Sequence, residues 1–188
     1  MANTATLLSP KKMASPLNCA KQNIVLTGFM GSGKSHISRL ISRESGLLFI
    51  DTDALLELRE GMSVVKIFAT FKESGFRERE VELCTKLEHS LRHSIISTGG
   101  GTPLFYDVRR LGRVFFLDIP FEKILARLQG AACSKRPLFS DPKRAQALYE
   151  ERYDSYQSSA DYVIDANRKD SEIAKEILAH SLEILTHN

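Results

Sequence analysis

Short runs of apolar residues alternate along the chain with longer stretches in which apolar residues recur every three or four positions. The short runs are typical of strands that are buried on both faces, and the longer stretches predict amphipathic helices. This alternation predicts the α/β class, with a five-stranded parallel sheet covered by helices on both faces. We expect the strands at 24–27, 47–50, 94–98, 113–118 and 161–165, and the last helix near 170–186.

One stretch in the second half of the chain lacks this periodicity. It runs from Gly130 to Pro142 and contains glycine, serine, two prolines, a cysteine and several basic residues. Long loops without secondary structure are uncommon in compact domains, and many of those that occur close over a binding site. The segment is therefore predicted to be a lid at about 130–142.

Length and composition favour an ordinary globular domain. The chain has 188 residues, of which 43% are hydrophobic and 26% charged. These values suit one domain with a good core. No apolar run approaches the length of a membrane span. We expect a single domain at 23–188 and no membrane segment.

The first 22 residues differ from the rest. They contain Lys11, Lys12 and Lys21 and no acidic residue, so they account for the whole formal charge of +3. The remainder is formally neutral, which does not indicate a nucleic-acid groove. Residues 1–22 also lack the apolar core of a secretory signal. We expect a disordered leader on a cytoplasmic protein. The alternative is an organelle transit peptide, which would place the protein in a stroma.

The three cysteines do not form a metal-binding pattern. Cys19, Cys84 and Cys133 are odd in number and share no metal-like spacing, which fits a reducing compartment. Cys84 lies on the apolar stripe of a predicted helix and is expected to be a core residue.

The first predicted strand runs into a glycine-rich loop. From Gly28 to Ser35 the sequence reads G-x-x-x-x-G-K-S, which is the pattern of a phosphate-binding loop. Gly28, Gly31 and Gly33 would let backbone N–H groups turn inward, and the helix predicted next would present its N-terminus to an anion. Lys34 would reach the β- and γ-phosphates of a nucleotide, and the Ser35 hydroxyl would bind Mg²⁺. A chance glycine-rich turn is disfavoured by the strand before it and the helix after it.

Two acids, Asp51 and Asp53, stand at the carboxyl end of the second predicted strand. Ligands bind at this edge of open α/β sheets. One acid could hold water on Mg²⁺, and the other could orient or deprotonate an attacking hydroxyl. The alternative is that an aspartate caps the helix that follows.

The third and fourth predicted strands also end in residues of functional interest. The third runs into Gly99, Gly100 and Gly101, which favours a turn whose backbone lies close to a ligand over a merely flexible turn. The fourth ends in Asp118 and resembles a Walker B strand. Because Pro120 and a helix follow directly, Asp118 could instead cap that helix.

Arg77 is predicted near the start of an amphipathic helix, where a basic side chain opposes the helix macrodipole. An arginine in that position could serve a ligand anion. The alternative is an ion pair with Glu73 or Glu80 at the surface.

Two further arginines could contact anions. Arg136, in the predicted lid, could neutralise charge on a transferring phosphate when the lid closes. Its alternative is a solvated loop residue. Arg152 lies on a predicted helix and could instead pair with a nearby acid such as Asp154.

Six spaced motifs occur in a fixed order: GFMGSGKS, DTD, FRE, GGG, RPL and R152-x-x-x-Y156-x-x-x-A160. This set closely resembles the shikimate kinase family, P-loop enzymes that phosphorylate the 3-hydroxyl of shikimate with ATP on the route to aromatic amino acids. The resemblance covers about residues 22–186. It implies the three-layer P-loop kinase fold, with a sheet order of 2-3-1-4-5 and a lid loop.

The resemblance also implies a role for each matched residue, with Mg²⁺ as cofactor and ATP as co-substrate. The glycine triplet stands where the family would otherwise have a Walker B element, so Asp118 is interpreted as a decoy. A monomer is expected. The implied catalytic residues are Asp53, Lys34 and Arg136; the ATP-binding residues are Gly31, Ser32, Gly33, Lys34, Ser35, His36, Arg127, Arg136 and Arg168; the shikimate-binding residues are Asp53, Arg77, Gly99, Gly100, Gly101 and Arg152; and the metal-binding residues are Ser35 and, through water, Asp51.

The sequence departs from the family pattern in two places. The family usually has Gly-Glu shortly before the Phe-Arg, and this chain has Lys72-Glu73. The segment between Arg127 and Arg136 is slightly longer than in many relatives, which bears on the role of Arg127.

Other functions are less compatible with these motifs. A gluconate kinase or a nucleoside monophosphate kinase would share the phosphate loop, but GGG together with FRE argues against both. A regulatory GTPase would carry Asn-Lys-x-Asp to read guanine, and the sequence contains no such tetrapeptide. A catalytically dead relative would have lost some of the matched charged residues, all of which are present.

Overall fold

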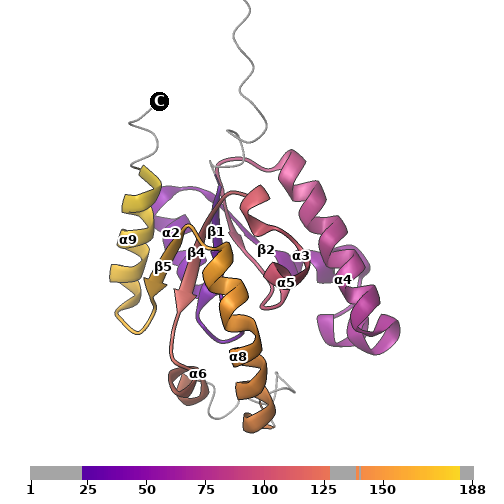
Figure 1. Cartoon of the computed structure of the whole chain (residues 1–188). Helices are drawn as coiled ribbons and strands as arrows, with labels where there is room; N and C mark the ends of the chain where they lie inside the picture. The colour runs from indigo at the N-terminus through magenta and orange to yellow at the C-terminus, as the bar shows by residue number, and fades with distance from the viewer. Residues whose placement is uncertain (1–22, 128–138, 140, 183–188) are drawn as a thin grey trace, which may run out of the picture.

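The computed structural model describes residues 23–127, 139 and 141–182. Its five strands form one parallel sheet in the order β2-β3-β1-β4-β5, which confirms the predicted class and order (Figure 1). The central strand β1 is fully buried, whereas the edge strands are partly exposed. The strands are β1 Ile24–Thr27, β2 Leu48–Asp51, β3 Ser94–Ser97, β4 Arg113–Asp118 and β5 Tyr162–Asp165.

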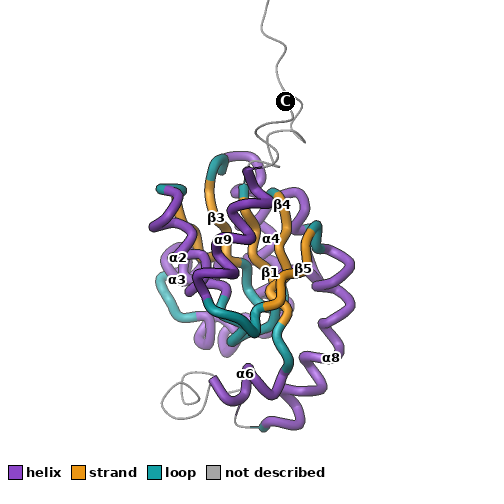
Figure 2. The backbone as a smooth tube through the Cα atoms, turned by 90° about the vertical axis from the view of Figure 1, so that its left-hand side faces the viewer, coloured by secondary structure: helices purple, strands orange, loops and turns teal. Residues whose placement is uncertain are grey.

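Helices cover both faces of the sheet, as the alternating pattern predicts. Helices α2 (Lys34–Ser45) and α9 (Asp170–Leu182) pack together over one face, and α4 (Val64–Ser90) and α8 (Pro142–Ser159) lie over the other (Figures 1 and 2). The shorter helices are α3 Thr52–Glu60, α5 Thr102–Phe105, the 3₁₀ turn η1 Val108–Arg110 and α6 Phe121–Arg127.

The core consists of two clusters of buried residues, and β1 contributes to both. Leu26 packs with Ile37 and Ile41 of α2, whereas its neighbour Val25 packs with Leu83 of α4. Successive side chains of a strand point to opposite faces, so a short continuous apolar run fills both clusters. The predicted core residue Cys84 is buried in the second cluster.

Helix α4 is interrupted at Lys72, where the backbone has φ 62° and ψ −175°. This conformation is one that glycine adopts readily and other residues do not. The turn in which the family usually places glycine is therefore present here with lysine. Arg77 lies five residues beyond the interruption, so it is near the start of the second helical segment of α4, as the sequence predicts.

The carboxyl end of the predicted lid belongs to a helix. The Asp141 side chain accepts a hydrogen bond from the Arg144 N–H, and Pro142 is the first residue of α8. Aspartate at the N-cap and proline at the first helical position are favourable helix starts, so the end of the segment predicted at about 130–142 coincides with the start of α8. Most of the segment, including Arg136 and Cys133, lies outside the described residues.

Candidate active site

The phosphate loop connects β1 to α2, as the sequence predicts. Gly33 is the N-cap of α2 and has φ 100°, and Gly28 has φ 137°. A Cβ at Gly28 would lie 3.0 Å from the Leu117 carbonyl oxygen, so the loop packs closely on β4. Lys34 begins the helix and is buried, and its Nζ donates to the carbonyl oxygens of Gly28 (2.7 Å) and Phe29 (3.0 Å). The ammonium group is thereby held against the loop.

Ser35, the next residue of the loop, points toward the ends of β2 and β3. Its Oγ donates to Asp51 Oδ2 over 2.6 Å and lies 3.3 Å from Ser97 Oγ. Asp51 and Ser97 are paired in the register of the two strands. The other Asp51 oxygen, Oδ1, accepts hydrogen bonds from the backbone N–H groups of Asp53 and Ala54. Asp51 is therefore both a helix cap and a neighbour of the loop serine, and the two interpretations of it are compatible.

Two hydroxyls and one carboxylate oxygen thus meet at the mouth of the phosphate loop. Hard oxygen ligands of this kind suit Mg²⁺, which takes one or two protein ligands and completes its shell with phosphate oxygens and water. The chemistry of the donors fits the predicted metal at Ser35 and Asp51. Ser97 was not predicted, although a hydroxyl two residues before the glycine triplet, at the same sheet edge, was a usable signal.

The glycine triplet after β3 is where side chains from three helices meet. A Cβ at Gly99 would lie 2.8 Å from Asp53 Oδ1, and Arg152 Nη1 donates to the Gly100 carbonyl oxygen over 3.2 Å. A Cβ at Gly101 would lie 2.6 Å from Arg77 Nη1. Each glycine therefore leaves room for, or bonds to, one predicted substrate residue. A side chain at Gly99 or Gly101 would occupy the space of the carboxylate or the guanidinium.

Asp53 stands in surroundings that disfavour its charge. Burial, followed by the charges of Asp51 and Glu80, raises the pKa of Asp53 from 3.8 to about 6, and Lys34 offsets part of this effect. A carboxyl group with a pKa near neutrality is suited to accept and release a proton.

Arg77 makes both ion pairs that the sequence offered as alternatives to ligand binding. Its Nη1 donates to Glu80 over 2.7 Å and its Nη2 to Glu73 over 3.3 Å. The pair with Glu80 is buried, because Arg77 and Glu80 are 8% and 2% exposed, whereas Glu73 is an exposed residue. Thr102 Oγ1 also donates to Glu80, over 2.7 Å. Within the described part of the chain, Arg77 Nε is buried and has no hydrogen-bond partner.

Arg152 is also buried, on the face of α8 that lies toward the triplet. It bonds to Gly100 and makes no ion pair with Asp154 or any other described acid. The Tyr156 hydroxyl, one helical turn further, donates to the same Gly100 oxygen. Arg152 Nε has no hydrogen-bond partner among the described residues. A buried N–H group without a partner is costly, and a bound anion would satisfy it.

Three of the predicted ATP-binding residues lie near the connection from β5 to α9. Arg127 Nη2 donates to the Ala166 carbonyl oxygen (3.0 Å) and its Nη1 to the Ser32 carbonyl oxygen (3.5 Å). His36 Nε2 lies 3.0 Å from Asp170 Oδ2, and Arg168 pairs with Glu176. Arg127 therefore joins the phosphate loop to this connection, and His36 and Arg168 are exposed or partly exposed near it.

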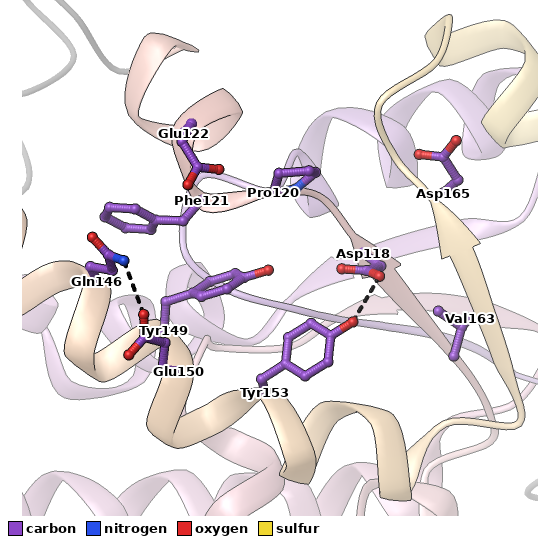
Figure 3. A pocket seen from close by; sticks show the side chains of 10 residues that line it. All are labelled: Asp118, Pro120, Phe121, Glu122, Gln146, Tyr149, Glu150, Tyr153, Val163 and Asp165. Carbon is purple, nitrogen blue, oxygen red and sulfur yellow. Dashed lines mark hydrogen bonds between the residues drawn. The ribbon is translucent and has the colours of Figure 1, made fainter.

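A separate pocket of about 660 Å³ lies between α6, α8 and the ends of β4 and β5 (Figure 3). None of the predicted phosphate or substrate residues lines it. Asp118 does, and it accepts a hydrogen bond from the Tyr153 hydroxyl over 3.0 Å. No hydrogen bond from Asp118 to the start of α6 is recorded among the described residues, so the side chain is tied to α8 and does not cap α6.

This combination of fold and site is that of the P-loop kinases that phosphorylate small molecules. Within that class, the chain belongs to the shikimate kinase family, whose family model matches residues 30–181. It is 45% identical to the shikimate kinase of Helicobacter hepaticus over 157 residues, which span 84% of this chain and 94% of that protein.

Solved structures support the same assignment. A shikimate kinase from Acinetobacter baumannii in complex with shikimate has a TM-score of 0.76 and 30% identity, covering 87% of this chain and 94% of that one. A shikimate kinase from Aquifex aeolicus has a TM-score of 0.71 and 37% identity, covering 88% and 98%. None of the described helices is long and apolar enough to cross a membrane.

Proposed function

We propose that this chain transfers the γ-phosphate of ATP to the 3-hydroxyl of shikimate, as its family does. The observation that carries the proposal is the glycine triplet, where one carboxyl group and two buried guanidinium groups meet beside a phosphate loop. A substrate with one carboxylate and several hydroxyls matches this set of charges. Shikimate is such a molecule, and a relative of known structure holds it.

Arg77 and Arg152 would bind the substrate carboxylate. Each has a buried Nε–H without a partner among the described residues, and in each the terminal nitrogens are at least partly occupied by the protein. A carboxylate between the two arginines would accept a hydrogen bond from each Nε–H. It would also balance the positive charge of Arg152, since Glu80 and Glu73 pair only with Arg77. Gly99, Gly100 and Gly101 would form the backbone wall of the substrate site.

Asp53 would accept a hydrogen bond from the substrate hydroxyl and take its proton as the phosphate is transferred. Lys34 would neutralise charge on the β- and γ-phosphates, and the backbone of Gly31, Ser32 and Gly33 would cradle them. Ser35, with Asp51 through water, would hold Mg²⁺, which when bound supplies charge neutralisation on the phosphates.

On the nucleotide side, Arg127, Arg168 and His36 would contact ATP beside the connection from β5 to α9. The contacts of Arg127 with both this connection and the phosphate loop support that assignment. Arg136 would approach the phosphates from the segment between α6 and α8, a role that stays a prediction from the sequence.

We also propose that the enzyme acts as a monomer, the state that is expected from the sequence. Light scattering after size exclusion tests this directly. The cytoplasmic location, and the leader at residues 1–22, stay predictions from the sequence.

The test of the function is ADP release from MgATP with shikimate, with gluconate and with no acceptor, followed by phosphorus NMR of the product. We expect shikimate-dependent ADP release and a new phosphomonoester signal. Release with gluconate alone, or equal release without an acceptor, would refute the proposal.

A pair of variants on α8 connects the activity to the site. Arg152→Lys keeps the positive charge but loses the planar, forked set of N–H donors of the guanidinium. We expect the KM for shikimate to rise about 10- to 100-fold, which corresponds to the loss of one hydrogen bond to a charged group. Arg144→Lys, an exposed arginine on the same helix, should leave it unchanged. Equal behaviour of the two variants would count against the carboxylate clamp.

A further inference from the structure

Phe105 is a large apolar side chain that remains 48% exposed although it lies next to the candidate site. It is the last residue of the short helix α5, which directly follows the glycine triplet. The centre of its ring lies 4.5 Å from Arg77 Cζ. Gly101 and Phe105 are four residues apart, a spacing that places them on one helix face, and Arg77 lies against both.

Acidic side chains contact the edge of the Arg77 guanidinium, and aromatic rings contact its face. Glu80 and Glu73 occupy the edge of the guanidinium with hydrogen bonds. Aromatic rings lie over it, at 5.1 Å for Phe76 and 4.5 Å for Phe105. Phe76 comes from α4, the helix of Arg77 itself. Phe105 is the closer ring and comes from another element, so it connects Arg77 to the glycine triplet.

A ring over a guanidinium has two physical effects. The electron-rich face attracts the cation, and the apolar surface excludes water from it. Exclusion of water lowers the local dielectric constant and strengthens the pairing of the cation with an anion. The exposed ring of Phe105 would therefore strengthen the binding of the substrate carboxylate by Arg77.

We propose that Phe105 is a positioning residue for substrate specificity, which holds the Arg77 guanidinium against the glycine triplet and shields it from water. The inference rests on the proposed function, since it assigns to Arg77 the carboxylate of shikimate. Phe105 acts through Arg77 and needs no contact with the reacting atoms. Its effect belongs to substrate binding and not to phosphate transfer.

The experiment compares Phe105→Leu, which keeps apolar bulk without a ring, with Phe105→Tyr, which keeps the ring. For the leucine variant we expect the KM for shikimate to rise about three- to fivefold, the usual size of a cation–π contact at a partly exposed site. The kcat, the KM for ATP and the thermal midpoint should not change. Phe105→Tyr should behave as the wild type, and so should Leu58→Ala, which removes an apolar side chain that is 79% exposed on α3.

Two results would overturn the inference while leaving the proposed function intact. One is a wild-type KM for shikimate in Phe105→Leu, and the other is a loss of kcat with no change in KM. In either case the wild type still phosphorylates shikimate. If the wild type itself does not release ADP with shikimate, the proposed function and this inference fail together.

Discussion

Lys72 provides a prediction whose sign can be worked out from the backbone alone. At φ 62° and ψ −175° it occupies a region that is almost restricted to glycine, and such residues cost about 1–3 kcal/mol each. The side chain is exposed and makes no hydrogen bond or ion pair with another described residue. Replacement by glycine therefore removes strain and sacrifices no native contact that the structure records.

The gain is offset in part by the unfolded chain, because glycine loses about 0.5–1 kcal/mol more conformational entropy on folding. The net expectation for Lys72→Gly is a free energy of unfolding about 1 kcal/mol higher than that of the wild type. For a chain of this size, this corresponds to a thermal midpoint about 2–4 °C higher.

The same substitution elsewhere in α4 should act in the opposite direction. Lys86 is exposed and helical and forms a surface ion pair with Glu82. Lys86→Gly should destabilise the protein by about 1 kcal/mol, the helix-propensity difference, plus a few tenths for the pair. Lys72→Ala retains Cβ and hence the strain, so it should stay near the wild type and separate the backbone effect from the loss of a lysine.

The measurement is urea-induced unfolding of the wild type and the three variants at one pH, with thermal unfolding as a second probe. The KM for shikimate should stay the same in Lys72→Gly, because the turn that precedes Glu73 and Arg77 keeps its shape. If Lys72→Gly destabilises the protein as Lys86→Gly does, the positive φ is not a source of strain and the reasoning is refuted.

The remaining predictions concern three residues of the site. Gly101→Ala would place a Cβ 2.6 Å from Arg77 Nη1, so steady-state kinetics should give at least a tenfold higher KM for shikimate with an unchanged KM for ATP; an unchanged shikimate KM would contradict the close packing. Because the pKa of Asp53 is raised to about 6, kcat/KM for shikimate should fall below that pH, and Asp53→Asn should lower kcat about 10²- to 10⁴-fold. The folded state binds the Asp53 proton up to a higher pH than the unfolded chain does, so the stability gained from this proton is lost as the pH rises from about 4 through 6. The free energy of unfolding of Asp53→Asn should therefore exceed that of the wild type by up to about 3 kcal/mol at pH 7, and the difference should disappear near pH 4. Ser97→Ala should raise the Mg²⁺ concentration needed for half-maximal activity several-fold without changing the KM for shikimate, and an unchanged Mg²⁺ dependence would remove Ser97 from the metal site.

Much of the fold follows from the sequence because buried parallel strands carry continuous apolar runs. All five strands were predicted within a residue or so of their observed bounds. The strand order came from the family resemblance, because periodicity alone does not say which strands are neighbours. The Lys72 turn could not be seen in the hydrophobic pattern, since lysine and glutamate are compatible with an uninterrupted helix. Only the comparison with the usual Gly-Glu pointed to that position.

The candidate site divides in a similar way. Residues that would face a ligand were predictable, because phosphate requires glycine and lysine in a fixed spacing and a carboxylate requires arginine. Residues that hold them in place were missed or misjudged. Ser97 is 62 positions from the Ser35 that it approaches, and Thr102 is 22 positions from the Glu80 that it contacts. Such pairs form because the fold brings distant residues together, so no local sequence pattern predicts them.

For Arg77, ligand binding and an ion pair with a neighbouring acid are compatible roles and not alternatives. The sequence suggested either a ligand anion or an ion pair with Glu73 or Glu80, and the structure contains both ion pairs. Those carboxylates accept one hydrogen bond from each terminal nitrogen, whereas Nε is buried without a partner in the described residues. The ion pairs therefore do not exclude an anion, because they fix the guanidinium in an orientation in which its buried Nε–H has no partner among the described residues. A buried arginine that is held by acids and keeps an unsatisfied Nε–H therefore supports the proposed carboxylate site.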